Sequence, residues 1–299
     1  MNSPRDVLVL GASGFLGTHV ASLLGSRAVA HSRDATRASA ATAAADLTEG
    51  GELLRLLDAH PTRALINCSA LSQPAACEAD PRAAEAMNTD LPRALGEWAS
   101  AAGARLIHVS TDLVFGGTSA PAGGFAEEDE PAPLSVYGES KAQGERALLE
   151  VAPEALVVRL PLLYGDGRGT GRGASEDLFA TLERGEPARL FKDEWRTPLP
   201  VSVAAAALTE LCDMDTRGLL HVAGADRVSR LELGRALHAC RFQDEDRMER
   251  ELQGCVRAEL DLTPPRPEDT SLCSERARAL LETELPGLTE GVPAALATA

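Results

Sequence analysis

The residues of this sequence best suited to proton transfer are a tyrosine and a lysine four residues later. The chain of 299 residues holds only two tyrosines and two lysines, yet Tyr137 and Lys141 stand at this spacing. Chance would produce such a pair with a probability of roughly 0.01. On a helix the two side chains share one face. A phenol has a reference pKa of about 10, and a neighbouring ammonium lowers it by stabilising the phenolate. The pair therefore predicts a tyrosine that exchanges a proton with a substrate oxygen.

Two hydroxyl side chains and a carboxylate stand upstream of the tyrosine. Ser110, Thr111 and Asp112 come at the end of a segment that predicts a strand, 105–110. Open α/β sheets bind their ligands at the carboxyl ends of their strands. A loop rich in glycine and proline then leads to Tyr137. We therefore expect one of these polar groups to orient the carbonyl that Tyr137 protonates.

Three glycines near the N-terminus have the pattern of a dinucleotide-binding turn. Gly11, Gly14 and Gly17 stand between an apolar run, 6–10, and a helical stretch, 14–24. In such a turn the first glycine permits the bend and the second lets a pyrophosphate approach the helix N-terminus. The third lets helix and strand pack closely. This spacing arises by chance roughly 0.2 times per chain, so the prediction depends on the strand and helix that flank it.

The residues after the second expected strand distinguish two nicotinamide cofactors. A carboxylate at this place binds the ribose 2′-OH of NAD, whereas an arginine accommodates the 2′-phosphate of NADP. This chain has Ser32 and Arg33 there, followed by Asp34. An arginine can hold a phosphate through two parallel hydrogen bonds. NADPH is therefore the expected cofactor, and Asp34 keeps NADH open.

Strand-like and helical stretches alternate through the first half of the chain. This alternation predicts βαβ units and an α/β fold, a doubly wound parallel sheet of the Rossmann type. The expected strands are 6–10, 28–31, 64–68, 105–110 and 155–160. We expect this NAD(P)-binding domain over 1–160, with 201–222 as a segment that could rejoin it. A second, smaller α/β lobe that binds substrate is expected over 161–299.

The composition excludes several other classes of protein. The chain has 45 acidic and 29 basic side chains, and its net charge of −16 makes binding to nucleic acid unfavourable. No apolar run reaches the ~18 residues of a membrane span, and the first residues lack a signal-peptide pattern. The six cysteines are scattered without the spacing of a metal site. We expect reduced thiols, no bound metal, no membrane partner and a cytoplasmic protein.

Further sequence blocks accompany these motifs along the chain. They are Ile66 to Ala70, Cys77-Glu78, Met87 to Thr89, Val109 to Phe115, Tyr137 to Glu145, Arg159 to Gly165, Trp195 to Pro198 and Arg266-Pro267. Together with the turn from Gly11 to Gly17, these blocks resemble the extended short-chain dehydrogenase/reductases. Within that family they resemble the dTDP-4-dehydrorhamnose reductase group.

By position, the resemblance implies a catalytic set, a cofactor site and a substrate site. Thr111, Tyr137 and Lys141 would be catalytic, with Ser110 as the alternate hydroxyl. The residues implied at the cofactor are Gly11, Ser13, Gly14, Phe15, Leu16, Gly17, Arg33, Asp46, Leu47, Ser69, Ala70 and Asn88. Those implied at a nucleotide-sugar substrate are Asp112, Arg196 and Arg266. NADPH would deliver a hydride to a C4 ketone while Tyr137 protonates the oxygen.

Two positions depart from the pattern of the group and leave alternatives open. Leu113 stands where the group has a tyrosine, and Leu162 lies in a block where it has a tryptophan. The aromatic side chains that the group has at these two positions are expected near the sugar. The identity of the nucleotide and of the sugar therefore stays open. The block from Arg159 to Gly165 also resembles the regulatory β subunit of methionine adenosyltransferase, a non-classical relative that binds NADP. An NAD-dependent epimerase or dehydratase is a further alternative, and whether the chain forms a homodimer is open.

Overall fold

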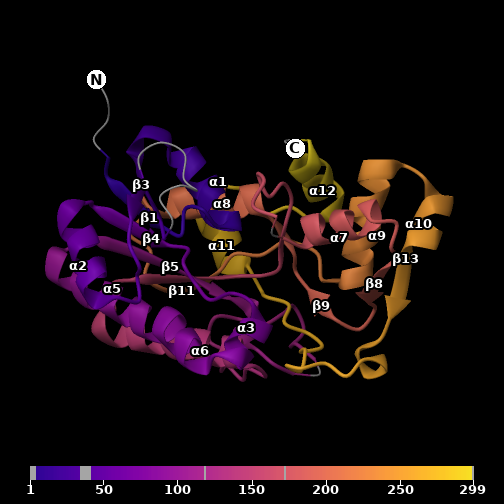
Figure 1. The fold of residues 1–299 in the computed structure, drawn as a ribbon, viewed down its shortest axis with the longest axis horizontal. Coiled ribbons are helices and arrows are strands. Elements are labelled where there is room, and N and C mark those ends of the chain that lie inside the picture. The colour runs from indigo at the N-terminus through magenta and orange to yellow at the C-terminus, as the bar shows by residue number, and fades with distance from the viewer. Residues whose placement is uncertain (1–4, 34–41, 118, 172, 298–299) are drawn as a thin grey trace. The chain divides into compact units, whose positions relative to one another are not determined.

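The structure is a computed structural model that describes residues 5–33, 42–117, 119–171 and 173–297. The chain forms two compact units (Figure 1). The first consists of Met1–Thr111, Ser135–Arg159 and Ala205–Leu220. The second consists of Asp112–Leu134, Leu160–Ala204 and His221–Ala299. Each unit therefore collects segments that are far apart in the sequence.

The first unit is built on a sheet whose strands, among the described residues, lie in the order β11-β6-β5-β4-β1-β2-β3. The strands are β1 (Val7–Leu10), β2 (Ala28–Ser32), β3 (Thr42–Ala44), β4 (Ala64–Asn67), β5 (Arg105–Thr111), β6 (Leu156–Leu160) and β11 (Gly218–His221). Parallel pairing joins β1 to β2 and to β4, and β4 to β5. The register sets Asn67 beside both Leu10 and His108. The carboxyl ends of β1, β4 and β5 are therefore neighbours.

Helices cover both faces of this sheet (Figure 1). They are α1 (Phe15–Leu24), α2 (Gly50–Ala59), α3 (Pro74–Ala79), α4 (Pro81–Glu85), a π-helical turn (Ala86–Asp90), α5 (Leu91–Ala102), α6 (Val136–Val151) and α8 (Val201–Leu211). Buried leucines of α2, α5 and α6 form one core with side chains of β1, β4, β5 and β6. Helices α1 and α8 lie on the other face (Figure 1).

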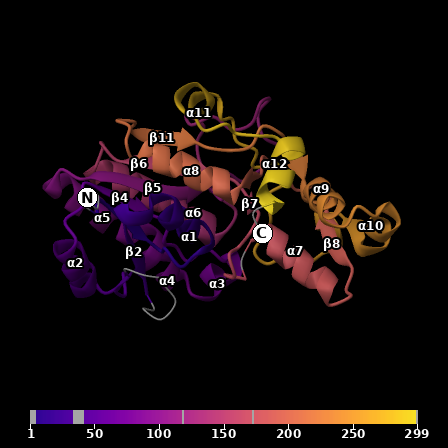
Figure 2. The same ribbon diagram turned by 90° about the horizontal axis from the view of Figure 1, so that it is seen from above.

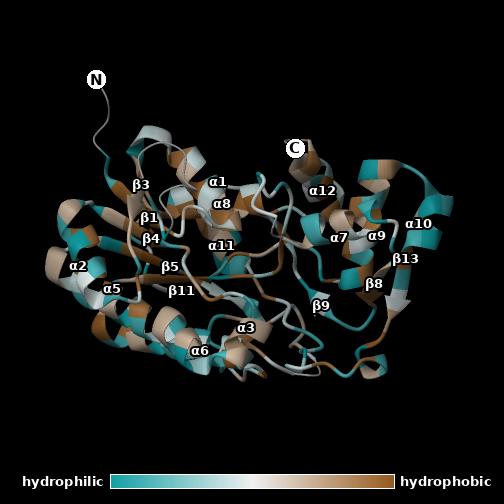
Figure 3. Ribbon diagram, in the orientation of Figure 1, coloured by the Kyte–Doolittle hydropathy of each residue, from teal (hydrophilic) through white to brown (hydrophobic). Residues whose placement is uncertain are grey.

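Apolar patterning explains why these segments adopt these elements. All four residues of β1 are fully buried, as expected for a parallel strand covered on both faces. Helix α2 buries Leu53, Leu56 and Leu57 on one face, whereas Leu54 is 57% exposed. Hydropathy differs between elements in a related way. Figure 3 shows strands β4 and β5 as hydrophobic and helix α10 of the second unit as hydrophilic.

The second unit contains short strands and helices around its own core. Its elements are β7 (Leu163–Tyr164), α7 (Ala174–Glu183), β8 (Ala188–Phe191), β9 (Trp195–Arg196), β10 (Leu199–Pro200), β12 (Val228–Ser229), α9 (Arg230–Phe242), α10 (Glu245–Glu251), β13 (Leu252–Cys255), α11 (Glu275–Leu280) and α12 (Leu288–Leu296). The strands pair as β10 with β7, β12 with β9, and β13 with β8. Helix α12 lies beside α9 (Figure 2), and leucines of α7 and α9 form the core with Tyr164.

The predicted α/β class, a doubly wound parallel sheet with a second lobe, is confirmed. The two units differ from the predicted domain limits, since 112–134 lies in the second unit and not in the first. Of the segment 201–222, which could rejoin the first domain, 205–220 belongs to the first unit and the rest to the second. Within 112–134, Phe125 bridges to Leu272, and Glu127 accepts a hydrogen bond from the backbone of His221. Such long-range contacts leave no local pattern in the sequence. Within the described chain, no helix has the length and apolar character needed to cross a bilayer.

Candidate active site

Helix α6 positions both members of the tyrosine–lysine pair. Ser135 caps its start by accepting a hydrogen bond from the Gly138 N–H at 3.1 Å. The Glu78 carboxylate accepts another from the Val136 N–H at 2.9 Å. Tyr137 and Lys141 then follow on one face, and they are 8% and 1% exposed. The predicted helix and the shared face of this pair are both present.

Lys141 is held by groups on the neighbouring strand β5. Its Nζ donates to the Val109 carbonyl at 2.7 Å and lies 3.1 Å from His108 Nε2. Burial lowers the pKa of Lys141 from 10.5 to about 8. Burial, together with the charge of Lys141, also holds the pKa of His108 well below its ordinary value. The lysine therefore sits in a dry, polar environment where its charge is disfavoured.

The predicted hydroxyls lie at the carboxyl end of β5. Thr111 is the last residue of the strand and is 8% exposed, and Ser110 is 4% exposed. Among the residues that the structure describes, Ser110 Oγ has no hydrogen-bond partner. A buried hydroxyl without a partner is costly in a folded protein. Such a hydroxyl is suited to bond to a ligand at the end of β5.

The glycine-rich turn has the geometry that the motif predicts. Gly11 has a φ of 74°, which favours glycine, and a side chain there would collide with Ser69. A side chain at Gly17 would collide with the Gly11 carbonyl. Helix α1 begins after Gly14, where none of the described side chains caps its N–H groups. These uncapped N–H groups at a helix N-terminus suit a pyrophosphate, with Ser13, Phe15 and Leu16 in the same turn.

The end of β2 carries the groups expected at the cofactor ribose. The Ser32 hydroxyl donates to Ser13 Oγ at 2.9 Å, and Arg33 is exposed. The charge of Arg33 also helps to lower the pKa of Asp46, whose carboxylate accepts two hydrogen bonds from Thr48. Leu47, beside it, is 6% exposed and belongs to the sheet core. Asp34 lies outside the described residues.

Asn88 is hydrogen-bonded to the backbone of Leu71, the residue that follows Ser69 and Ala70. Its amide bonds to both the N–H and the carbonyl of Leu71, at 3.0 and 3.1 Å, and donates to Ser140 Oγ at 3.0 Å. Asn88 is fully buried in the π-helical turn. Its side chain therefore fixes the 69–71 segment against helix α6.

The predicted substrate residues lie in the second unit and are ion-paired there. Arg196 Nε lies 3.4 Å from Asp112, and its Nη2 lies 3.3 Å from Glu194. Arg266 lies 3.1 Å from the same Glu194. Arg196, Arg266 and Arg230 together hold the pKa of buried Glu194 below its ordinary value. Three guanidinium groups therefore act on Glu194, and Asp112 is a second carboxylate in the same cluster.

The sequence did not single out Asn67, His108 or Glu194 as site residues. Asn67 Nδ2 lies 3.0 Å from His108 Nδ1, and both side chains are fully buried. The sequence did contain a signal for the first two, because Asn67 and His108 are polar residues within apolar stretches of strands β4 and β5. Pairing them required the register between β4 and β5, which the sequence alone does not give.

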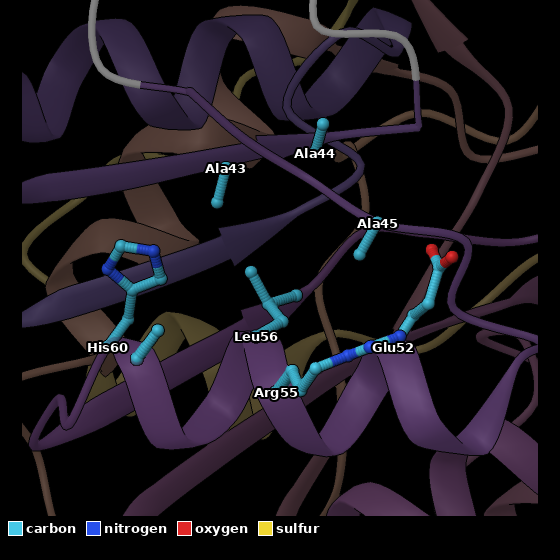
Figure 4. Close-up of a pocket in the computed structure, with 8 residues that line it drawn as sticks. Ala43, Ala44, Ala45, Glu52, Arg55, Leu56 and His60 are labelled. Carbon is cyan, nitrogen blue, oxygen red and sulfur yellow. The ribbon is translucent and has the colours of Figure 1, made fainter.

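A pocket of about 400 Å³ lies between β3 and α2 (Figure 4). It is lined by Ala43, Ala44, Ala45, Glu52, Arg55, Leu56, Ala59 and His60. The predicted site residues do not line it. Over the described residues, no cluster of His, Cys, Asp and Glu could hold a metal ion.

Comparison with known proteins identifies the family. A model of the RmlD substrate binding domain matches residues 5–299. The probable low-salt glycan biosynthesis reductase Agl14 of Haloferax volcanii is 32% identical, over 96% of this chain and 95% of the relative. Methionine adenosyltransferase 2 subunit beta of Pongo abelii is 30% identical, over 78% of this chain and 71% of the relative.

A solved structure shows the same fold over nearly the whole chain. This structure of dTDP-4-dehydrorhamnose reductase from Bacillus anthracis in complex with NADP has a TM-score of 0.84 and 20% sequence identity, and the match covers 99% of this chain and 100% of that one. The family match over 5–299 includes both the glycine turn and the helix that carries Tyr137 and Lys141. The chain belongs to the RmlD substrate binding domain family of extended short-chain dehydrogenase/reductases, which are NAD(P)H-dependent oxidoreductases.

Proposed function

We propose that the protein is an NADPH-dependent reductase of a nucleotide-activated 4-keto sugar, with Tyr137 as the proton donor. The observation that carries this proposal is the buried face of helix α6. It presents Tyr137 and Lys141 one turn apart. Thr111 at the end of β5 belongs to the same unit, as does Ser110, whose hydroxyl has no hydrogen-bond partner among the described residues. Since Agl14 is named a probable reductase, the likeness to it supports reduction.

The first unit fits a dinucleotide. The tight turn at Gly11 and the uncapped start of α1, among the described groups, suit a pyrophosphate. Arg33 is exposed at the end of β2, where it would pair with the 2′-phosphate of NADP. The related B. anthracis structure is described as a complex with NADP. When bound, the nicotinamide cofactor supplies the hydride.

The chain's own residues supply the proton and the orientation. Tyr137 donates its phenolic proton to the developing alkoxide, a role that contributes roughly 10²–10⁴-fold to a rate. Thr111, or Ser110, donates a hydrogen bond that orients the ketone oxygen. Lys141 stabilises the phenolate that remains, because an adjacent ammonium favours the ionised phenol. Each of these groups is at least nine-tenths buried, which strengthens its electrostatic effect.

We propose that the arginine cluster of the second unit binds the diphosphate of the substrate. Arg266 shares Glu194 with Arg196, and its side chain is 48% exposed, so its guanidinium group is accessible to a phosphate. Guanidinium groups can bind phosphate oxygens in pairs. Asp112, which pairs with Arg196 and accepts a hydrogen bond from Thr270 at 2.8 Å, fixes the direction of Arg196.

The test is cofactor oxidation with a panel of substrates. NADPH is mixed with the protein and with dTDP-, UDP- and GDP-linked 4-keto sugars, and the nicotinamide absorbance at roughly 340 nm is followed. The proposal predicts consumption of NADPH with at least one nucleotide sugar. Protein that binds NADPH yet consumes none of it with any of these substrates would contradict the proposal.

A second candidate function is a non-catalytic NADP-binding subunit. It is favoured by the 30% identity to methionine adenosyltransferase 2 subunit beta. This role needs NADP binding but not a proton donor. Tight NADPH binding, no turnover across the panel, and Tyr137→Phe protein that behaves like the wild type would together favour it.

A further inference from the structure

The imidazole of His31 joins the glycine turn to the residues that follow β3. His31 stands in β2 and is 2% exposed. Its Nδ1 accepts a hydrogen bond from the Gly11 N–H at 3.4 Å, and its Nε2 lies 3.0 Å from the Ala45 carbonyl oxygen. Because β2 lies between β1 and β3 in the sheet, this one side chain reaches the backbone on both sides of its own strand.

The two backbone partners fix the protonation of this imidazole. A backbone N–H can only donate, so Nδ1 accepts from Gly11 and carries no proton. A carbonyl oxygen can only accept, so Nε2 carries a proton that points at Ala45. Both ends therefore require the same tautomer, the neutral ring with its proton on Nε2. Burial, which lowers the pKa of His31 below its ordinary value, favours this neutral form.

The hydrogen bonds continue through one peptide group to helix α2. The carbonyl that accepts from His31 belongs to the peptide between Ala45 and Asp46, and the N–H of the same peptide donates to the Glu52 carboxylate at 2.6 Å. Every donor points the same way, from Gly11 towards Glu52, and hydrogen bonds arranged in this way strengthen one another. The peptide is held on both sides, which leaves its plane little freedom to rotate.

This series of bonds connects two parts of the proposed cofactor site. Gly11 begins the turn that suits a pyrophosphate, and Asp46 and Leu47 are among the residues expected at the cofactor. The backbone adds to the connection at the turn, because the Ala12 N–H donates to the His31 carbonyl at 2.8 Å. The spacing between the glycine turn and residues 46–47 therefore depends on His31.

We propose that His31 is a positioning residue for the nicotinamide dinucleotide, and that Glu52 supports it. The neutral imidazole sets the distance between the pyrophosphate turn and the residues after β3, so both are in place before the cofactor binds. A site held in this way loses less conformational freedom on binding, which raises its affinity. This inference rests on the proposed function and deepens it, because it assigns further residues to recognition of the same cofactor.

The first test is the tautomer of His31 in the wild-type protein. The chain has six histidines, so the His31 signals of protein labelled with ¹⁵N at histidine are assigned by their loss in His31→Asn. At about pH 8, where an ordinary histidine is neutral, the proposal predicts a ring that carries its proton on Nε2. A proton on Nδ1 would overturn the proposal, because Nδ1 could not then accept from Gly11.

Three variants remove the bonds of His31 singly or together. In His31→Asn the amide oxygen takes the place of Nδ1 and keeps the bond from Gly11, whereas the longer side chain of His31→Gln brings its NH₂ group to Ala45. Each variant loses one hydrogen bond, so its Kd for NADP⁺ should rise by roughly threefold to tenfold. His31→Leu loses both bonds, and its Kd should rise by roughly tenfold to a hundredfold. Calorimetric titration with NADP⁺ measures each value.

The affinity of the folded variants separates positioning from a structural role. A residue that only stabilised the fold would change the free energy of unfolding but leave the Kd for NADP⁺ unchanged well below the melting temperature. The matched control is His60→Gln, since His60 is a half-buried histidine that follows α2 in the same unit. This control should keep the wild-type affinity. Wild-type affinity in His31→Leu, or an equal loss in His60→Gln, would contradict the proposal.

Variants of Glu52 give a second test at a half-buried position in the first turn of α2. Glu52→Gln keeps an oxygen that accepts from the Asp46 N–H, so its Kd for NADP⁺ should stay within about twofold of the wild type. Glu52→Ala removes this acceptor and should raise the Kd by roughly threefold to tenfold. Both changes remove the same charge, so the difference between them isolates the hydrogen bond. Equal affinities in these two variants would count against the proposal.

Failure of this proposal and failure of the proposed function give different results. If NADP⁺ affinity depends on His31 as predicted and no 4-keto sugar is reduced, the positioning role stands and the reductase function fails. If 4-keto sugars are reduced and the His31 variants bind NADP⁺ like the wild type, the function stands and the positioning role fails. Wild-type protein that binds neither NADP⁺ nor NAD⁺ would overturn both.

Discussion

Arg33 is the side chain on which the choice between NADPH and NADH depends most directly. It is exposed at the end of β2, one residue after Ser32, whose hydroxyl is bonded to Ser13 of the glycine turn. A guanidinium bound to a 2′-phosphate contributes through charge-assisted bonds. Hydrogen bonds from Thr48, and to a smaller extent the charge of Arg33, lower the pKa of Asp46. Removal of the arginine therefore also leaves a carboxylate that repels a phosphate.

Arg33→Ser is therefore expected to weaken NADPH binding by roughly tenfold to a hundredfold. NADH binding should change much less, because NADH lacks the 2′-phosphate. Titration of tryptophan fluorescence with each cofactor measures both affinities. Arg93→Ser is a matched control, since Arg93 is an exposed arginine paired with Glu97 on α5. Equal losses of NADPH and NADH affinity in Arg33→Ser would show that Arg33 does not bind the 2′-phosphate.

Helix α6 carries the catalytic pair, and its attachment to the sheet decides how well that pair is placed. Arg159 of β6 binds the Glu145 carboxylate at 2.7 Å, and the two side chains are 1% and 4% exposed. At Gly144, one residue earlier, a side chain would collide with the Asn88 carbonyl. The ion pair of Glu145 with Arg159 and the close approach of Gly144 to the Asn88 backbone therefore both hold helix α6 about one turn beyond Lys141.

Arg159→Met should destabilise the protein by about 3–5 kcal/mol, because it leaves the Glu145 charge buried without its partner. Chemical denaturation measures this free energy of unfolding. The control is Arg184→Met, which breaks an exposed pair with Glu186 and should change stability by no more than about 1 kcal/mol. Similar small effects in both variants would show that the buried pair does not anchor α6.

The elements were easier to predict from the sequence than the contacts between them. Tyr137 and Lys141 lie on one helix, so their spacing alone placed them on one face. The glycine turn is equally local. Lys141 meets His108, however, because of the side-by-side packing of α6 and β5, and His108 meets Asn67 through the strand register. Arg196 was predicted to bind an anion, and Glu194 stands only two residues before it. Its other partner, Asp112, is far away in the sequence and meets it only in the fold.

At the scale of the whole molecule, buried Lys141 links stability to pH. Its pKa in the folded protein is about 8, below its ordinary value of 10.5. Between these pH values the unfolded chain binds more protons, so the contribution of this group to stability rises with pH. Below about pH 8, charging the buried lysine costs the folded state about 3 kcal/mol relative to the unfolded chain.

Lys141→Met removes this cost. The free energy of unfolding of the variant relative to the wild type should therefore fall by about 3 kcal/mol as the pH rises from about 8 to about 10.5. Urea denaturation of both proteins across this range measures the difference. A difference that does not change with pH would mean that Lys141 keeps an ordinary pKa when the protein folds.

The central claim is that Tyr137 donates the proton while a reduced nicotinamide cofactor supplies hydride to a sugar ketone. It is tested most directly with NADPH that carries deuterium on both faces of nicotinamide C4 and mass spectrometry of the nucleotide-sugar product. The account predicts one deuterium in the product of the wild-type protein, and a rate lowered by roughly 10²–10⁴-fold in Tyr137→Phe at unchanged NADPH affinity. The control is Tyr164→Phe at the other tyrosine, which lies in the core of the second unit and should keep the wild-type rate. Deuterium transfer at the wild-type rate by Tyr137→Phe, or none by wild-type protein that binds NADPH, would contradict the account.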